Sequence, residues 1–337
     1  MKYDKSFFTP EIRWGFTISE MMKRCWAANL DVLEVFKEVC RQNGLKYYAA
    51  YGTLLGALRH NGFVPWDDDV DLIMIREDYD RFIEIAPQVL PKGFVLSGMY
   101  GSDKRLWQAN DRMHTRMIVD EEYYSLPEFM TLFHGYPYQR VGFDLFVLDH
   151  VPADRQIQYE LVKNYQFIFF VLENLAIYEE KGMLSGQLEA IEKAFSFKLD
   201  RDDKVILHRQ LRFLADRLAA ETPRENSDFL FDIRNMSVPD SFEAFGGFEN
   251  GVRMEWYGDG IEVPFENTTI RVPEKAFDVM EANFGPGWMM PVKFTSEHSY
   301  PCYINQEAEL RRLLDESGIS LPIDDFCRNW HMMNGGD

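Results

Sequence analysis

The sequence contains few cysteines and no cysteine pair spaced for zinc binding. Its four cysteines are Cys25, Cys40, Cys302 and Cys327, and no two of them are separated by only two residues, which argues against a zinc cluster. Cys25 and Cys40 fall in one helix-like segment, roughly 22 Å apart at about 1.5 Å per residue, so they cannot form a disulfide there. The cysteine content fits a reducing compartment.

The sequence also lacks a long apolar run. It has no stretch of about 18 uninterrupted apolar residues, and residues 1–5 are not followed by an apolar signal core. Its densest apolar stretch, residues 167–172, is short and flanked by polar residues, so we interpret it as a core helix. We therefore predict no integral membrane segment. We expect a cytoplasmic protein, with a peripheral position at the inner membrane face as the alternative.

Positive charge is scarce. Lys and Arg number 36 against 55 Asp and Glu, which gives a formal net charge of -19. Such a surface repels polyanions, so we predict no nucleic-acid partner and no adsorption to anionic lipid. An anionic substrate stays compatible with this charge if a metal ion and local Arg or Lys side chains offset the field. Hydrophobic residues make up 46% of the chain, which is enough for a sizeable core.

The pattern of apolar residues predicts an α/β (α+β) fold with a helical insertion. A helix is expected from Ser19 to Gln42, because apolar residues recur there at helical spacing between a capping serine and Gly44. Short apolar strands and helices alternate up to Pro152, and residues 154–221 then read as helical throughout, with breaks near Gly182 and residues 200–202. We predict a catalytic core at 1–152, a helical insertion at 153–222, completion of the core at 223–305 and a helical tail at 306–337.

The acidic run from Asp67 to Asp71 carries the strongest chemical signal. It lies between Phe63-Val64-Pro65-Trp66 and the apolar stretch Leu72-Ile73-Met74-Ile75. In a strand, Asp69 and Asp71 would share one face, where carboxylates about 6 Å apart repel by roughly 3 kcal/mol at an effective dielectric near 20. A divalent cation removes this repulsion, and hard oxygen ligands favour Mg²⁺ or Mn²⁺.

Two other interpretations of the acidic run were weighed. A solvated acidic loop is common in general, but the apolar flanks disfavour it here. A calcium-binding EF-hand loop is disfavoured because its sixth position is Leu72, where the turn requires glycine, and its twelfth is Asp78 rather than glutamate.

Two further elements support a phosphate-handling site. Gly52 and Thr53 follow a short aromatic strand and precede a helix predicted from Leu54, so they can present N–H groups to a phosphate. Asp144 lies inside the apolar strand predicted at residues 143–148, where an unpaired charge would be costly. We therefore predict that Asp144 completes a metal site with Asp69 and Asp71.

These residues resemble the LicD family of phosphotransferases, relatives of the fukutin group in the nucleotidyltransferase superfamily. The resemblance rests on the run from Tyr51 to Leu72 and its continuation at residues 76–79, with weaker matches at 143–146, 263–266, 284–289 and His298. It covers about residues 30–150 well and 255–300 in pieces. It implies a nucleotidyltransferase-like mixed sheet flanked by helices, with a metal bound by an Asp-x-Asp motif.

The resemblance also implies a reaction. A phospho-alcohol such as phosphocholine would pass from a CDP-linked donor to a hydroxyl of a cell-surface glycan or its precursor, for example a teichoic acid or a lipopolysaccharide. Metal held by Asp69, Asp71 and Asp144 would neutralise the pyrophosphate. Asp144 or Asp67 would accept the hydroxyl proton.

Other side chains are predicted to contact substrate, each with a plain structural alternative. These are Gly52, Thr53, Arg59, His60, Trp66, Arg76 and His298. Arg59 and Arg76 would stabilise developing charge, and Trp66 would stack on a base or a quaternary ammonium group, although most tryptophans serve packing. The two histidines would line the site or lie on the surface.

Two other functions remain open from the sequence. In a nucleotidyltransferase that transfers the nucleoside monophosphate itself, the acceptor would attack the other phosphorus of the donor. A non-catalytic metal- or glycan-binding module with a relict site is the alternative from a different class, although such a module has no need to keep buried charge.

Overall fold

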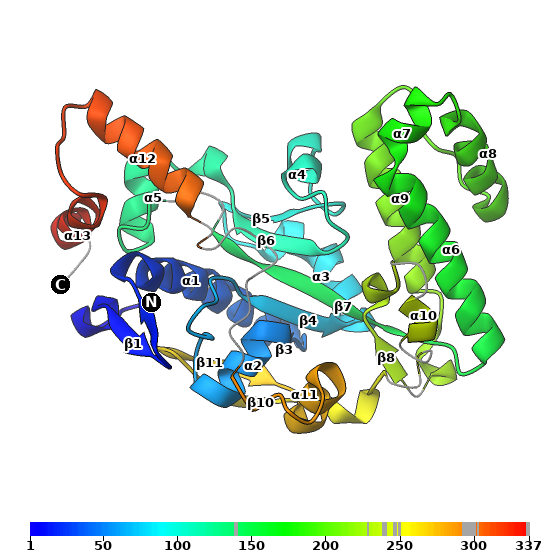
Figure 1. The fold of residues 1–337 in the computed structure, drawn as a ribbon, viewed down its shortest axis with the longest axis horizontal. Helices are drawn as coiled ribbons and strands as arrows, with labels where there is room; N and C mark the ends of the chain where they lie inside the picture. Colours follow the sequence, from blue (N-terminus) through cyan, green and yellow to red (C-terminus); the bar gives the residue numbers. More distant parts are fainter. Residues whose placement is uncertain are drawn as a thin grey trace.

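The fold is built around a mixed β-sheet with helices on both sides (Figure 1). The computed structural model describes residues 1–137, 141–227, 229–237, 241–244, 248, 251–291, 301 and 303–334. The mixed sheet flanked by helices confirms the α/β (α+β) class predicted from the sequence.

Among the described residues the central sheet has seven strands, in the order β3-β4-β7-β6-β5, with β8 paired to β7 and β9 to β8. In this part of the chain β4 and β7 run parallel, and the other pairs of the sheet are antiparallel. The strands are β3 (Tyr48–Ala49), β4 (Asp71–Ile75), β5 (Phe94–Ser97), β6 (Thr115–Val119), β7 (Gly142–His150), β8 (Phe229–Phe231) and β9 (Val252–Arg253). Two hairpins stand apart from the sheet, namely β1 (Glu11–Arg13) with β2 (Phe16–Ile18), and β10 (Ile261–Phe265) with β11 (Thr268–Val272).

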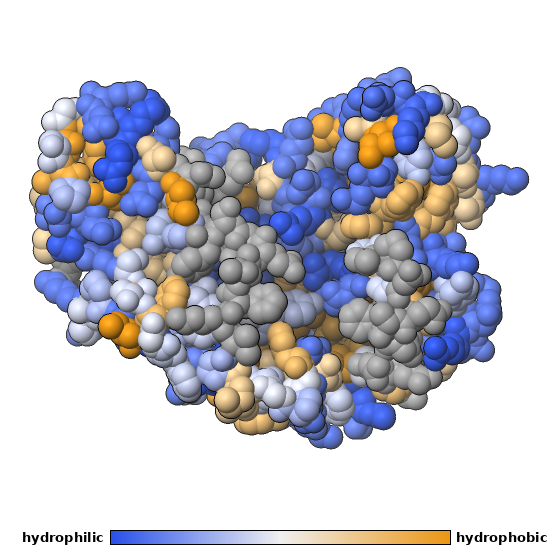
Figure 2. All heavy atoms as spheres, viewed as in Figure 1, coloured by the Kyte–Doolittle hydropathy of each residue, from blue (hydrophilic) through white to orange (hydrophobic). Residues whose placement is uncertain are grey.

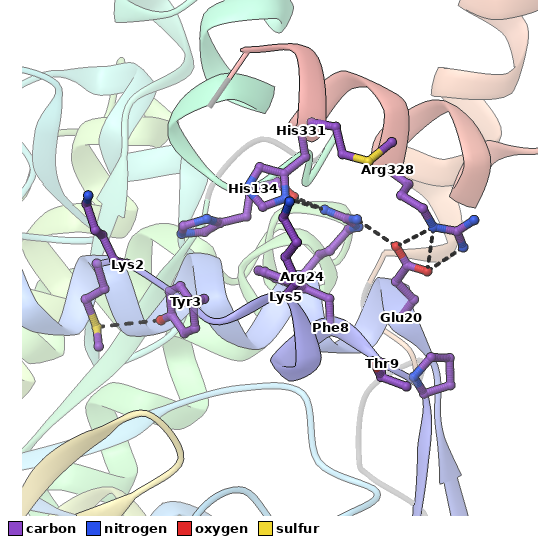
Figure 3. A pocket seen from close by; sticks show the side chains of 13 residues that line it. Lys2, Tyr3, Lys5, Phe8, Thr9, Glu20, Arg24, His134, Arg328 and His331 are labelled. Carbon is purple, nitrogen blue, oxygen red and sulfur yellow. Dashed lines mark hydrogen bonds and ion pairs between the residues drawn. The ribbon is translucent and has the colours of Figure 1, made fainter. Parts of the chain in front are cut away.

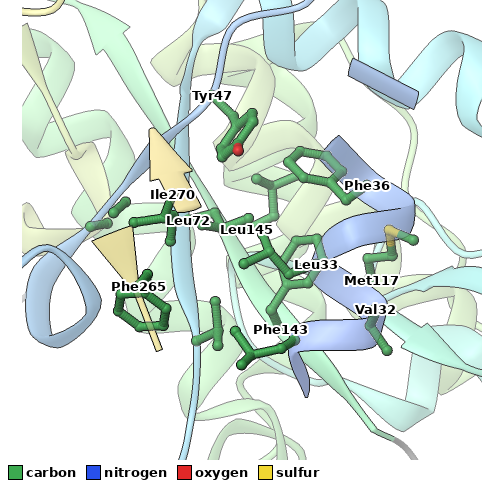
Figure 4. Packing of buried hydrophobic residues seen from close by; sticks show 14 of the residues in the cluster. Val32, Leu33, Phe36, Tyr47, Leu72, Met117, Phe143, Leu145, Phe265 and Ile270 are labelled. Carbon is green, nitrogen blue, oxygen red and sulfur yellow. The ribbon is translucent and has the colours of Figure 1, made fainter. Parts of the chain in front are cut away.

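Helix α1 (Glu20–Asn43) covers one face of the sheet. It begins as predicted, because Ser19 Oγ accepts a hydrogen bond from the Met22 N–H at 3.1 Å, and it ends at Gly44, which has a left-handed φ of 62°. Val32, Leu33 and Phe36 of α1 pack on Leu72, Phe143 and Leu145 of the two parallel strands (Figure 4). Each such side chain stabilises the fold by about 1.5–3 kcal/mol when fully buried.

Helix α3 (Arg76–Val89) packs beside α1, where Phe82 lies edge-on to Phe36 with ring centroids 5.1 Å apart. The remaining helices of the first half are α2 (Tyr51–His60), α4 (Lys104–Ala109) and α5 (Leu126–Leu132), with 3₁₀ turns at η1 (Lys5–Phe8) and η2 (Glu121–Tyr123). The sequence analysis did not predict the β1–β2 hairpin, α4 or α5, because these elements are too short to show a clear periodicity.

The predicted helical insertion forms a lobe at one end of the sheet (Figure 1). It contains α6 (Arg155–Glu173), α7 (Leu175–Glu180), α8 (Leu184–Phe195) and α9 (Lys204–Ala219). The breaks fall near Gly182 and Asp200 as predicted, and a further break occurs at Asn174. A second hydrophobic cluster joins α6, α7, α8 and α9 and also includes Phe231 of β8, so the helices of the lobe pack on one another and on the sheet.

The chain then returns to the sheet and ends in helices. The elements are η3 (Arg224–Asn226), η4 (Ile233–Met236), α10 (Ser241–Ala244), η6 (Met254–Trp256), α11 (Ala276–Phe284), α12 (Ile304–Glu316) and α13 (Ile323–Asn334). Helix α13 packs against α5. The range predicted as a tail is therefore helical, and its last helix contacts the core.

In the part of the chain that the structure describes, none of the helices has the length and apolar character needed to cross a bilayer. The face shown in Figure 2 is largely hydrophilic, and its hydrophobic residues form small separate patches.

A buried ion-pair network ties the lobe to the sheet. Arg76, at the start of α3, donates from Nε to Asp149 of β7 at 2.7 Å and from Nη2 to Asp216 of α9 at 3.0 Å. All three side chains are buried. Asp149 therefore pairs with Arg76.

We expect Arg76→Leu to lower the free energy of unfolding by about 3–5 kcal/mol, because it leaves Asp149 and Asp216 buried without their cation. Urea denaturation followed by tryptophan fluorescence measures the change. The matched control is Arg217→Leu, since Arg217 is 46% exposed in its ion pair with Asp80 and its loss should cost no more than about 1 kcal/mol. Equal effects of the two substitutions would contradict the role assigned to Arg76.

Candidate active site

The two parallel strands bring Asp71 and Asp144 side by side. They are direct partners in the β4–β7 register. Side chains alternate between the faces of a strand, so both project from the face opposite Leu72 and Leu145, which pack on α1. The structure thus unites two residues that are 73 positions apart in the sequence, as predicted.

Asp67, Asp68 and Asp69 form a tight group just before β4. Their carboxylate oxygens can all lie within 4.8 Å of one another. The strand begins at Asp71, so Asp69 belongs to the preceding loop, and the prediction that Asp69 and Asp71 project from one strand was wrong in that detail. The loop rather than strand alternation positions Asp69. We call Asp67, Asp68, Asp69, Asp71 and Asp144 together the acidic centre.

Helix α1 holds the backbone of this loop. The Trp26 indole N–H donates to the carbonyl oxygen of Asp67 at 2.9 Å, and the Asn29 amide donates to that of Asp68 at 3.2 Å. Both donors come from the helix that covers the other face of the sheet. The loop is therefore fixed to the core, and its carboxylates cannot separate by a simple movement of the backbone.

Helix α2 begins beside the acidic centre, and its first turn contains Gly52 and Thr53. The helix starts at Tyr51, so Thr53 lies in its first turn, and the predicted start at Leu54 was wrong. The Thr53 hydroxyl oxygen instead accepts the N–H of Asp71 at 2.8 Å. A Cβ atom on Gly52 would come within 2.5 Å of Asp67 Oδ2. Gly52 is thus the residue that lets this carboxylate approach the helix start.

Electrostatic repulsion is strong in the acidic centre. Burial raises the pKa of Asp71 well above its ordinary value, and the charges of Asp69 and Asp144 raise it further. Burial likewise raises the pKa of Asp67, with Asp69 as the next cause. A group of hard carboxylate oxygens with unfavourable mutual repulsion is the donor set that suits Mg²⁺ or Mn²⁺, so these residues fit the predicted metal.

Asp144 differs from the other acids because cationic and neutral donors surround it. Arg116 Nε, on the neighbouring strand β6, lies 2.5 Å from Asp144 Oδ1, and His114 Nε2 lies 3.1 Å from Oδ2. Burial alone would raise the pKa of Asp144, but the contacts with His114 and Arg116 bring it below its ordinary value. These contacts therefore favour the ionised form of Asp144.

Arg234 completes this side of the site. Its Nη1 lies 3.2 Å from His114 Nδ1, and since a guanidinium can only donate, His114 accepts at Nδ1 and carries its proton on Nε2 toward Asp144. The guanidinium also lies over the Phe146 ring, 4.0 Å from its centroid. His114, Arg116 and Arg234 were not predicted from the sequence. The available signal for Arg116 was an arginine directly before the apolar run of residues 117–119.

Three of the predicted contact residues lie away from the acidic centre. Arg59 and His60 form the last turn of α2, about 10 Å along its axis from Gly52 at 1.5 Å per residue. Arg59 donates to the Trp288 carbonyl at 3.0 Å, and burial lowers the pKa of His60 to about 4. Arg76 lies at the far end of β4, in the buried network described above.

The last two predicted contact residues can be placed only in part. Trp66 immediately precedes the acidic run, is partly buried and lies edge-on to Phe16 with ring centroids 6.1 Å apart. His298 lies outside the described residues. Their substrate contacts stay predictions.

A cavity of about 350 Å³ lies elsewhere, between the N-terminal segment and α13 (Figure 3). Its charged groups already bind one another, because Glu20 accepts from both Arg24 and Arg328. We interpret this cavity as part of the contact between the two ends of the described chain.

Part of this chain is similar to a known family of proteins. Residues 44–147, which contain the whole acidic centre, match the family model described as the LicD/FKTN/FKRP nucleotidyltransferase domain. The lipopolysaccharide cholinephosphotransferase LicD of Haemophilus influenzae is 28% identical over 177 residues, which are 50% of this chain and 58% of that protein.

Two uncharacterised Rickettsia proteins match shorter stretches. That of Rickettsia typhi is 44% identical over 57 residues, and that of Rickettsia prowazekii is 42% identical over 60. These stretches are 17% and 18% of this chain, and 18% and 23% of the respective proteins. The chain thus spans little more than half the length of the Haemophilus protein and a smaller share of the other two.

We expect Gly52→Ala to impair metal binding without unfolding the protein. Alanine favours a helix over glycine by up to about 1 kcal/mol, while the new Cβ displaces the Asp67 carboxylate. Calorimetric titration with Mn²⁺ should show weaker binding, and the melting temperature should be unchanged or higher.

The matched control for this substitution is Gly186→Ala in α8, where a Cβ meets nothing within 4 Å. That variant should bind Mn²⁺ like the wild type. Unchanged Mn²⁺ binding by Gly52→Ala would mean that Asp67 is not part of the metal site.

Proposed function

We propose, on the premise that residues 44–147 form a LicD-family nucleotidyltransferase domain, that this protein is a metal-dependent phosphotransferase. It would transfer a phospho-alcohol, such as phosphocholine, from a CDP-linked donor to a hydroxyl of a cell-surface glycan or its precursor. The observation that carries the proposal is the acidic centre beside the first turn of α2, inside the matched domain. The name of the Haemophilus relative supplies the phospho-alcohol and the type of acceptor.

The acidic centre can hold the donor through a cation. Asp67, Asp69 and Asp71 would hold one or two Mg²⁺ ions, which would supply positive charge to offset that of the pyrophosphate. The N–H groups in the first turn of α2 carry the positive end of the helix dipole and face the same region, so they can bind phosphate oxygens. Arg116, 33% exposed at its side chain beside Asp144, can balance charge that develops on the donor.

The transfer step forms one bond and breaks one. The glycan oxygen bonds to the phosphorus that carries the alcohol, the bond from this phosphorus to the bridging oxygen breaks, and CMP leaves with that electron pair. The hydroxyl proton passes to a carboxylate of the acidic centre. Asp67 is better suited than Asp144 for this role, because both oxygens of Asp144 already lie within hydrogen-bond distance of Arg116 and His114.

The cellular site that we propose is the cytoplasm, with a peripheral position on the inner membrane face when the acceptor is bound to lipid. In the described part of the chain Cys25, Cys40 and Cys327 are buried thiols outside any disulfide, which agrees with a reducing compartment.

The decisive experiment is a screen of CDP-alcohols, including CDP-choline, for CMP release with a glycan acceptor and MgCl₂. We expect CMP release that requires both the acceptor and Mg²⁺, and EDTA should abolish it. Release of pyrophosphate or formation of a nucleotidylated glycan would instead identify a nucleotidyltransferase. Absence of any metal-dependent binding of CDP-choline in calorimetry would favour the non-catalytic module.

Asp71→Asn tests the central carboxylate. We expect turnover to fall by at least about a hundredfold, since even residues that only support metal ligands change activity by 10–100-fold. The melting temperature of the metal-free protein should stay equal or rise, because the substitution removes a carboxylate whose ionisation the fold disfavours. Asp202→Asn, at an exposed acid of the helical lobe, serves as the control. A sharp fall in melting temperature would show that Asp71 is structural instead.

A further inference from the structure

A second cavity lies on the same face of the sheet as the acidic centre. It measures about 270 Å³, and its floor contains Ile73 of β4 and Leu148 of β7. Ile73 is two residues beyond Asp71 and Leu148 is four beyond Asp144, so strand alternation places all four on one face. At about 3.3 Å per residue, Ile73 lies roughly 7 Å from Asp71 and Leu148 roughly 13 Å from Asp144 along their strands.

The walls of this cavity are mainly apolar and aromatic. They come from segments far apart in the sequence, namely the start of α2, strands β8 and β9, and helix α11. The wall side chains include Leu54, Leu230, Phe231, Val252, Tyr257 and Val279. A planar ring can be buried between such walls, as drug-sized ligands are in apolar pockets with few polar groups.

Two amides stand at the rim. Asn235 of η4 and Asn283 of α11 both line the cavity and are exposed, and among the described residues nothing engages either side chain. Each amide offers donors and an acceptor. Such groups match the hydrogen-bonding edge of a nucleobase.

The charged side chains at the inner end of the cavity neutralise one another. Asp232 lines it, but its carboxylate already accepts from Arg234 Nε at 2.9 Å and Nη2 at 2.5 Å, as well as from the Tyr51 hydroxyl. Burial raises the pKa of Tyr51 well above its ordinary value, and Asp232 raises it further, so the phenol stays neutral. The cavity therefore offers no free negative charge for a quaternary ammonium group, and an uncharged ring suits it better.

We propose that this cavity binds the nucleobase of the nucleotide donor, with the pyrophosphate reaching the acidic centre past Tyr51. The proposal rests on the proposed function and adds the place where the donor is recognised. A ribose and its phosphate span the distance that separates the cavity floor from Asp71. The phospho-alcohol then extends away from the cavity, toward the side on which the acceptor must enter.

Filling the cavity from an exposed position tests this proposal. Ala282 of α11 lines the cavity and is exposed, so Ala282→Trp should fold and block the space. In calorimetry with MgCl₂, we expect its affinity for CDP to fall by at least about tenfold, the scale of a lost base-stacking contact. Pyrophosphate has no base, so the affinity of the variant for it should stay within about twofold of the wild-type value. A tenfold change in affinity corresponds to about 1.4 kcal/mol. Glu281→Trp, at the neighbouring exposed position outside the cavity, should bind both ligands normally.

The outcomes separate this inference from the proposed function. Wild-type protein that binds no CDP with Mg²⁺ would overturn both. CDP binding that Ala282→Trp leaves unchanged would overturn the cavity assignment alone. Selective loss of phosphocholine binding in Ala282→Trp would show that the cavity takes the alcohol instead of the base. Asn235→Ala and Asn283→Ala should each weaken CDP binding about three- to tenfold, the scale of one lost hydrogen bond.

Discussion

Mutual repulsion among closely packed carboxylates is the constraint on which this structure depends. Two of the acids are fixed by the parallel pairing of β4 with β7, and the others by hydrogen bonds from α1 to the loop backbone. Holding these like charges together on a rigid support thus makes folding less favourable. A cation bound here would turn this cost into binding energy, because its ligands would already be in position.

The surroundings of the acidic centre divide it into two parts. On one side lie Asp67, Asp69 and Asp71, whose neighbours are mainly other acids. On the other side Asp144 is balanced by Arg116 and by His114. This division gives the site a strongly acidic part, suited to a metal, and a part with exposed positive charge, suited to a phosphoryl oxygen.

Much of the fold could be predicted from the sequence, for local reasons. The limits of α1 followed from Ser19 and Gly44. The β1–β2 hairpin was missed because each strand has only three residues. The start of α2 was placed too late, because Thr53 has the chemistry of a capping residue but binds β4 instead.

The candidate site was predictable where one motif contains it and not where distant segments meet. The acidic run and Asp144 could be recognised because charge interrupts apolar strands. Arg234 and Asp232 follow the helical lobe by many residues, and no local pattern connects them with Tyr51 or His114. Arg76 was expected to contact substrate because it follows the motif, yet five residues of strand carry it to the opposite end of β4. Spacing in sequence indicated the chemistry but not the direction in which each side chain points.

The three-way contact of Arg76 also constrains how the protein can be made. Asp216 follows Arg76 by 140 residues, so a ribosome finishes the domain that holds the acidic centre long before the last partner of this arginine leaves the exit tunnel. Until then Arg76 can pair only with Asp149 and with Asp80 of its own helix. The acid-rich half of the sheet therefore completes its folding only after the helical lobe has been synthesised, and a nascent chain stopped before α9 would keep a charged gap beneath α3.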